Sequence, residues 1–368
     1  MRRNGDGAVA IVGGGLAGFT AYVTLRHFGV RDVAVFSAER DPAGPFARRA
    51  GAIRQAAMRS ESDGHCYPRG FPGLAVREAA RRGTMAPLLG TVTNRYRPSL
   101  EWFLEHVEEL RERSGWDDAL VEGRIDRIAA VDGGFELDGH GRFRHVLIAP
   151  GHPGPAIPDE LAGDARVVHA YEPHPYAREV AVVGAGMAAA TEWLNALAAG
   201  ASVTSVRRRE PLRRPLNVER PLFTKRGLAA FHATTPARRA ELLSELSAPS
   251  FPPGDAWDEP LQRAAGEGRF RVREHVDGAE QVICATGFLR GFRHNALLAR
   301  LADEHGLATV DRWLVLDADA SVPGLTDGTR TLALSGAPAQ WAYPAADTLM
   351  GMKWVARRFA RRVTCRTR

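Results

Sequence analysis

Cysteine is scarce in this sequence, because Cys66, Cys284 and Cys365 are its only three and no two of them form a C-x-x-C pair. Cysteines this far apart argue against a disulfide framework, a thiolate zinc site and a dithiol redox centre. Apolar runs are short as well, and none approaches the roughly 18 residues of a membrane-spanning helix. The basic start, Met1–Arg3, is not followed by a signal-peptide pattern. We therefore expect a cytoplasmic protein without a membrane partner.

Lysine is almost absent, since only Lys225 and Lys353 occur among the 49 lysine and arginine residues. The formal net charge of +6 would suit a nucleic-acid-binding protein. The arginines, however, are scattered among acidic residues and lack the interleaved aromatic residues of a single-strand-binding surface. We therefore expect a solvated basic surface and no nucleic-acid partner. With 368 residues, the chain is long enough for two domains, each with a core of its own.

The sequence does have, at its start, a strand, a glycine-rich turn, a helix and a second strand within residues 8–36. Gly13, Gly15 and Gly18 of the turn match the pattern G-x-G-x-x-G. The first glycine permits a tight turn, the second lets the backbone approach a pyrophosphate, and the third lets the helix pack on the strand. The helix N-terminus adds unpaired N–H groups and the positive end of a dipole. This arrangement predicts a dinucleotide-binding unit.

One position departs from that pattern. An acidic residue is expected about twenty residues further on, at the end of the second strand, where it would bond the ribose hydroxyls. The sequence has Ser37 at this place and Glu39 two residues later. Either Ser37 makes a weaker hydrogen bond or Glu39 reaches back to the ribose.

A second unit of the same kind spans residues 179–206. Its turn contains Gly184, Gly186 and Ala189, which match the variant G-x-G-x-x-A. Residues 207–209, after its second strand, are all arginine, where a unit for NAD would carry an acid. Arginines suit the 2′-phosphate of NADPH, because they form bidentate charge-assisted hydrogen bonds. A solvated basic turn is the alternative interpretation.

Residues 41–97 lie between these units and show little periodicity. Long irregular segments are usually functional or disordered, and the aromatic and glycine content here predicts an ordered loop over a cofactor or substrate. His65 in this loop is a candidate acid–base group, although a lone loop histidine more often has a surface or hydrogen-bonding role. Elsewhere, helices are predicted over residues 99–113, 237–246 and 345–361, and strands over 120–131, 135–138, 142–149, 281–285 and 331–335.

The motifs at 13–18 and 184–189, followed by Ala285–Gly287, resemble in order and spacing those of flavoproteins with two dinucleotide-binding domains. The lack of C-x-x-C removes the disulfide reductases of that group. The loop Gly336–Pro344 and the pattern within residues 223–243 are more similar to the class B flavin-dependent monooxygenases, which comprise flavin-containing, Baeyer–Villiger and N-hydroxylating monooxygenases. The resemblance implies an α/β fold with two Rossmann-like three-layer domains, the NADPH domain being inserted in a discontinuous FAD domain.

The resemblance also implies domain boundaries and cofactor-binding residues. The FAD domain would comprise residues 1–172 and 285–368, and the NADPH domain residues 173–284. FAD would be held by Gly13, Gly14, Gly15, Gly18, Ser37 or Glu39, Gly336 and Ala337; NADPH by Gly184, Ala185, Gly186, Met187, Arg207 and Arg208; Thr286 and Gly287 would lie at the crossing between the domains. Two departures from the family pattern are Ala337, where Asp is usual, and Pro150, where Thr is usual.

The implied activity is that of an FAD- and NADPH-dependent monooxygenase. NADPH would reduce FAD, reduced flavin would form a C4a-peroxyflavin with O2, and one oxygen atom would pass to a small-molecule substrate. No catalytic side chain and no metal is implied. Two alternatives stay open, an NADPH-dependent flavoprotein reductase or dehydrogenase without oxygenation and a non-catalytic module that binds FAD and NADPH. The sequence leaves the substrate and the oligomeric state open, a homo-oligomer included.

Overall fold

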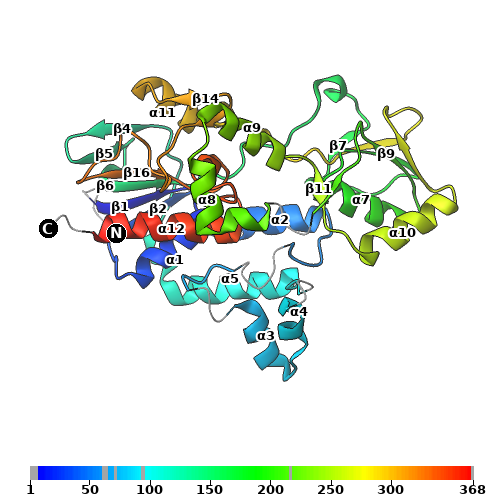
Figure 1. Ribbon diagram of the computed structural model, residues 1–368, viewed down its shortest axis with the longest axis horizontal. Coiled ribbons are helices and arrows are strands. Elements are labelled where there is room, and N and C mark those ends of the chain that lie inside the picture. Colours follow the sequence, from blue (N-terminus) through cyan, green and yellow to red (C-terminus); the bar gives the residue numbers. More distant parts are fainter. Residues whose placement is uncertain (1–6, 60–64, 70–72, 93–95, 215–217, 366–368) are drawn as a thin grey trace.

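The computed structural model describes residues 7–59, 65–69, 73–92, 96–214 and 218–365. Two sheets dominate it, and each has helices against its faces (Figure 1). The predicted fold class is confirmed, with two Rossmann-like units, one of them inserted in the other. Within the described residues, every helix is too short or too polar to cross a bilayer.

The larger sheet has seven strands in the order β3-β2-β1-β6-β5-β4, with β16 also beside β6. They are β1 (Gly7–Val12), β2 (Val33–Ser37), β3 (Leu120–Glu122), β4 (Ile128–Val131), β5 (Gly134–Leu137), β6 (Gly141–Ile148) and β16 (Thr331–Leu334). The first half of β6 pairs antiparallel with β5, whereas its second half pairs parallel with β1 and β16. The C-terminal part of the chain therefore returns to the N-terminal sheet.

Three long helices cover this sheet, namely α1 (Leu16–His27), α5 (Leu100–Ser114) and α12 (Leu349–Thr364). In Figure 1, α12 lies along α1, and α5 lies on the outer side of α1. The predicted helix over 99–113 is confirmed, with Ser99 accepting the N-terminal capping bond from the Trp102 N–H. The last helix begins at Leu349, later than predicted, because the Thr348 hydroxyl caps its N-terminus by accepting from the Gly351 N–H.

The segment 41–97 is more helical than its sequence indicated. It contains α2 (Gly44–Ala52), α3 (Leu74–Arg82) and α4 (Ala86–Val92), so the prediction of a long irregular loop was wrong for these residues. Alanine and arginine, which make up much of α2 and α3, are good helix formers. In Figure 1, α3 and α4 project away from the two sheets.

The smaller sheet has five parallel strands in the order β12-β9-β8-β13-β7. They are β7 (Val167–His169), β8 (Glu179–Val183), β9 (Ser202–Val206), β12 (Phe270–Arg273) and β13 (Gln281–Cys284). Helices α7 (Met187–Ala198) and α10 (Asp255–Gly266) pack together beside it. The predicted boundaries of the domains stay a prediction, but β7 already belongs to the smaller sheet.

Two helices in the predicted NADPH range pack instead with the larger sheet. They are α8 (Lys225–His232), which lies near α12 in Figure 1, and α9 (Pro236–Leu246), which contacts β14 (Thr309–Val310). Leu228, Phe231 and Leu243 are buried in the same core as the strands of the larger sheet. The remaining elements are α6 (Trp116–Ala119), α11 (Ala296–His305), β10 (Leu212–Arg213), β11 (Ser250–Phe251), β14 (Thr309–Val310) and β15 (Trp313–Leu314), with short 3-10 helices η1 (Asp159–Leu161), η2 (Arg220–Phe223), η3 (Phe292–His294) and η4 (Ala337–Trp341).

Substitution of Gly351, at the start of α12, can test how tightly this helix packs on the segment that precedes it. A Cβ at Gly351 would lie 1.9 Å from the Ala345 carbonyl oxygen and 2.5 Å from the Ala346 Cα. These are backbone atoms and cannot rotate away, so Gly351→Ala should lower the free energy of unfolding by roughly 1–3 kcal/mol. A Cβ at Gly266, in α10, meets nothing within 4 Å, and Gly266→Ala should be neutral or slightly stabilising. Urea unfolding of both variants checks this, and equal shifts of their midpoints would contradict it.

Candidate functional site

The first glycine turn joins β1 to α1, as predicted. Gly13 has φ +107°, and a Cβ there would lie 2.1 Å from the Ala149 carbonyl oxygen; a Cβ at Gly18 would lie 1.9 Å from the Gly13 carbonyl oxygen. A Cβ at Gly15, in contrast, meets nothing within 4 Å. Gly15 precedes α1, and no side chain caps the first turn of that helix. The turn is therefore closed where it packs on the sheet and open where a phosphate would approach.

Ser37 and Glu39 each have a protein partner at the end of β2. The Ser37 hydroxyl donates to the Glu39 carbonyl oxygen at 2.8 Å and lies beside Gly14, where an added Cβ would be 2.5 Å from its Oγ. The Glu39 carboxylate accepts from Arg48 Nη2 at 2.5 Å. Either side chain has to give up or share a bond to contact a ribose, so their predicted role stays a prediction.

The second glycine turn repeats the first between β8 and α7. Gly184 has φ +127°, and a Cβ there would lie 2.5 Å from the Ala285 carbonyl oxygen, at the end of β13. A Cβ at Gly186 would meet nothing within 4 Å, and no side chain caps α7. This turn can therefore receive a second pyrophosphate in the same way.

Arg207 and Arg208, which follow β9, are placed differently from one another. The Arg207 side chain is 12% exposed, donates to Glu210 at 2.9 Å and lies over the Trp193 ring at 5.4 Å. Arg208 is 86% exposed and 3.7 Å from Glu160. Exposed ion pairs of this kind are weak, so Arg208 is the freer of the two to contact a 2′-phosphate. The contacts of both arginines with a 2′-phosphate stay predictions.

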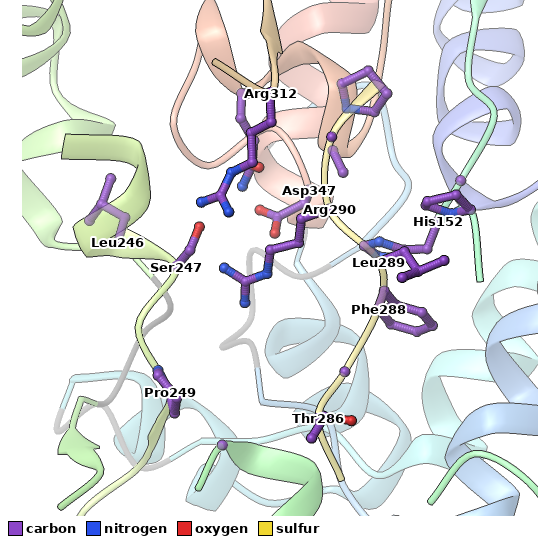
Figure 2. Close-up of a pocket in the computed structure, with 18 of the residues that line it drawn as sticks. His152, Leu246, Ser247, Pro249, Thr286, Phe288, Leu289, Arg290, Arg312 and Asp347 are labelled. Atoms are coloured by element: carbon purple, nitrogen blue, oxygen red, sulfur yellow. The ribbon is translucent and has the colours of Figure 1, made fainter. Parts of the chain in front are cut away.

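A cavity of about 500 Å³ extends from the second glycine turn to the loop after β16 (Figure 2). Of the residues predicted from sequence, it brings together Gly184, Ala185, Gly186, Met187, Thr286, Gly287 and Ala337. Gly336, with φ +75°, lies against α1, where an added Cβ would be 3.8 Å from the Ala17 Cβ. Among the described residues, the first glycine turn, Ser37, Glu39 and the two arginines after β9 do not line this cavity.

Three stacked rings form one wall of the cavity. The Phe288 ring lies between those of His152 and Tyr171, at centroid distances of 4.0 and 4.9 Å and interplanar angles of 6° and 18°. The Arg49 guanidinium lies 5.3 Å from the Phe288 centroid. Burial and the nearby charges of Arg49 and Arg290 lower the pKa of His152 to about 4, so its imidazole is neutral at pH 7. The wall is therefore flat, largely apolar and uncharged apart from Arg49.

Arg59 ties the two units together on another side of the cavity. Its guanidinium donates to the Ser250 carbonyl oxygen at 3.2 Å and to the Arg214 carbonyl oxygen at 3.0 Å. Burial, together with the charges of Arg97 and Arg214, lowers the pKa of Arg59 to about 10. The segment 41–97, to which Arg59 belongs, thus contacts β11 and the residue that follows β10.

The far end of the cavity, away from the second turn, contains three charged side chains. Figure 2 shows Arg290, Arg312 and Asp347 directed into the same space, which Ser247 also borders. Arg312 donates to the Ser244 hydroxyl at 3.2 Å and lies over the Trp313 ring. Burial raises the pKa of Asp347 to about 6, against the opposing effects of Arg290 and Gln340. The site therefore holds a carboxyl group that ionises close to neutral pH.

Arg290, Arg312 and Asp347 were not predicted from the sequence, whereas His65 has the hydrogen-bonding role that is usual for a lone loop histidine. The His65 side chain is buried beneath the surface, where its Nδ1 accepts from the Tyr67 N–H at 3.1 Å, and it lines neither large cavity. Its suggested acid–base role therefore finds no support in the lining of the cavity. The one sequence signal for Asp347 was a lone acid in an otherwise apolar stretch. The described residues contain no group of three or more metal-ligating side chains.

Comparisons with known proteins agree with this architecture. Residues 7–221 match the profile of the family described as pyridine nucleotide-disulphide oxidoreductase. Similar solved structures include an ornithine hydroxylase from Pseudomonas aeruginosa (17% identity, TM-score 0.68, 97% of this chain and 98% of that one). They also include an ornithine N-hydroxylase from Kutzneria sp. 744 (14%, 0.74, 99% and 100%) and a bacillithiol disulfide reductase from Bacillus cereus (13%, 0.60, 97% and 98%). No curated protein matches the sequence.

The raised pKa of Asp347 makes stability depend on pH. Its folded pKa of about 6 lies above the value of about 3.9 in an unfolded chain, so the folded protein holds the extra proton between pH 4 and 6. The contribution of Asp347 to the free energy of unfolding therefore falls as pH rises through this window. The free energy of unfolding of Asp347→Asn, minus that of the wild type, should therefore increase by on the order of 1–3 kcal/mol from pH 4 to pH 8. Urea unfolding of the cofactor-free proteins at the two pH values measures this difference.

Asp319 offers a control of opposite sign. Its burial alone would raise its pKa, but hydrogen bonds from Arg362 and Ser321 outweigh that effect and lower it. Its stabilising contribution is present at neutral pH and is lost as pH falls through its folded pKa. Asp319→Asn should therefore be less stable than the wild type at pH 8. The same direction of change in both variants would contradict the electrostatic argument.

Proposed function

Because the chain belongs to the pyridine nucleotide-disulphide oxidoreductase family, whose members bind FAD and NAD(P), we propose that it is an FAD- and NADPH-dependent monooxygenase. It would insert one oxygen atom from O2 into a small-molecule substrate. The observation that carries this proposal is the cavity itself, which joins the second glycine turn to the loop after β16 and has no cysteine among its lining residues.

The cysteines argue against the reductive branch of the family. Reduction of a disulfide requires a thiolate at the reaction site. Burial raises the pKa of both Cys66 and Cys284 to about 11, and Cys365 is exposed just after α12. The ornithine hydroxylases named above share the fold and, like this chain, are covered almost from end to end. Because these similar proteins are named as hydroxylases, they support oxygenation over disulfide reduction.

The residues of the chain suit both cofactors. When bound, FAD would be the group that accepts hydride from NADPH and reacts with O2. Gly15 and the first N–H groups of α1 would hold its pyrophosphate, and Gly186 with the start of α7 would hold that of NADPH. Within residues 1–172 and 285–368, the proposed FAD domain, Ala337 and Gly336 would flank the flavin, with Ser37 or Glu39 at its ribose. Within residues 173–284, the proposed NADPH domain, Arg207 and Arg208 would contact the 2′-phosphate.

The cavity walls would keep water away from the reacting atoms. The stacked rings of His152, Phe288 and Tyr171 present a flat surface, and Leu246 and Leu289 border the same space (Figure 2). Exclusion of water strengthens electrostatic interactions and suppresses side reactions. A neutral His152 can accept or donate one hydrogen bond without adding charge, so it would orient a ligand and not attract an anion.

The two open glycines allow the cofactor sites to be tested separately. In Gly15→Val the side chain would occupy space that is empty in the protein but needed by a pyrophosphate, so FAD content should fall by about tenfold or more while the fold is kept. In Gly186→Val the purified protein should stay yellow and lose NADP⁺ binding instead. Flavin released on heating and titration with NADP⁺ measure the two effects. A colourless wild type that cannot be reconstituted with FAD would leave only a degenerate binding module.

Oxygenation is tested by rapid mixing of the NADPH-reduced protein with O2. An absorbing species that differs from both reduced and oxidised FAD and persists for seconds is expected, because the stacked rings and the leucines that border the cavity would limit the access of water to the flavin. The control is the same experiment with free FAD, which should show no such species. Direct return to oxidised FAD with one equivalent of peroxide, with or without candidate amines or ketones, would instead favour an NADPH-dependent reductase or dehydrogenase.

A further inference from the structure

Two polar groups at the far end of the cavity lack hydrogen-bond partners. Oδ1 of Asp347 is buried and has none, and within the described ranges the Arg290 guanidinium makes no hydrogen bond and no ion pair shorter than 4.0 Å. The two charges attract one another, and Figure 2 shows both side chains directed into the cavity. A buried acceptor without a donor is costly, so this arrangement is expected to be completed by a ligand.

The missing partner must both donate and accept. Asp347 needs an N–H or O–H donor, and Arg290 needs an oxygen acceptor. A primary carboxamide offers both within one small planar group, its NH2 to the carboxylate and its carbonyl oxygen to the guanidinium. We propose that Asp347 and Arg290 together bind the carboxamide of the nicotinamide ring of NADPH, an inference that rests on the proposed use of that cofactor.

The positions of the two residues support this assignment. Asp347 lies in the connection between β16 and α12, which begins with Gly336 and Ala337, the residues proposed to flank the flavin. Hydride transfer requires the nicotinamide to stack near that flavin. Arg290 lies on the segment that leaves β13, which begins beside the second glycine turn at Thr286 and continues along the cavity. A dinucleotide that starts with its pyrophosphate at Gly186 and extends along the cavity would therefore reach this pair with its nicotinamide end.

Two other interpretations predict different behaviour. Asp347 and Arg290 could form only a water-separated ion pair, in which case neither would affect cofactor recognition. They could instead bind polar groups of the oxygenated substrate, in which case their loss would change substrate KM and leave cofactor binding unaltered. Both are outcomes of the experiment below.

The 3-acetylpyridine analogue of NADP⁺ isolates the contact with Asp347, because a methyl group replaces the amide nitrogen and the carbonyl oxygen is kept. Calorimetric titration of the FAD-loaded protein should show NADP⁺ binding about tenfold or more tightly than the analogue, as expected for one charge-assisted hydrogen bond. In Asp347→Leu this ratio should fall to near one. Asp347→Asn, which keeps an acceptor oxygen, should retain part of it.

Arginine variants complete the test. Arg290→Leu should weaken NADP⁺ and the analogue by equal factors, because both ligands carry the carbonyl group. Arg293→Leu, which removes an exposed arginine paired with Asp303 at 2.6 Å, should weaken neither. An unchanged ratio in Asp347→Leu would overturn the inference and leave the proposed function standing. A wild type that binds FAD but neither dinucleotide would overturn both.

Discussion

The close contact between each glycine turn and a carbonyl group from a distant strand is the constraint on which the structure depends. Gly13 touches the carbonyl of Ala149, and Gly184 touches that of Ala285. Both contacts are too short for any side chain, so they hold the carboxyl ends of neighbouring parallel strands together at each turn. The segments that leave those strands, 150–153 and 286–291, are thereby brought side by side, and the rings of His152 and Phe288 stack in one wall of the cavity. The cavity thus depends on one kind of backbone contact, which occurs once in each of the two units.

These contacts explain why so much of the fold could be predicted from the sequence. A glycine with positive φ next to an apolar run is a local signal, and so are Ser99 and Thr235, which cap helices α5 and α9. The two open glycines, Gly15 and Gly186, follow from the same spacing. Helices α2 and α3 were missed because each is only nine residues long and consists largely of arginine and alanine, so few large apolar residues were there to display a helical period.

The far end of the cavity could not be predicted, because its residues come together only in the folded chain. Arg290 follows β13, Arg312 precedes β15, and Asp347 precedes α12, and none has a neighbour in sequence that reveals its role. Many of the described arginines form ion pairs at the surface, as with Arg81 and Glu105 or Arg293 and Asp303. Arg290 differs because it has no such partner among the described residues and is directed into the cavity (Figure 2). Because the sequence contains 47 arginines, its composition does not distinguish Arg290 from the others.

Asp347 also argues against the cavity being a by-product of packing. A buried carboxyl group with a raised pKa destabilises the folded protein at neutral pH, and a neutral residue of the same shape would remove that penalty without disturbing the loop. Alanine or asparagine would serve the fold better. Residues that oppose stability while facing a ligand-sized space are typical of functional sites. The energetic disadvantage of Asp347 and its unsatisfied oxygen thus point to the same conclusion, that its favourable interactions form only when the cavity is filled.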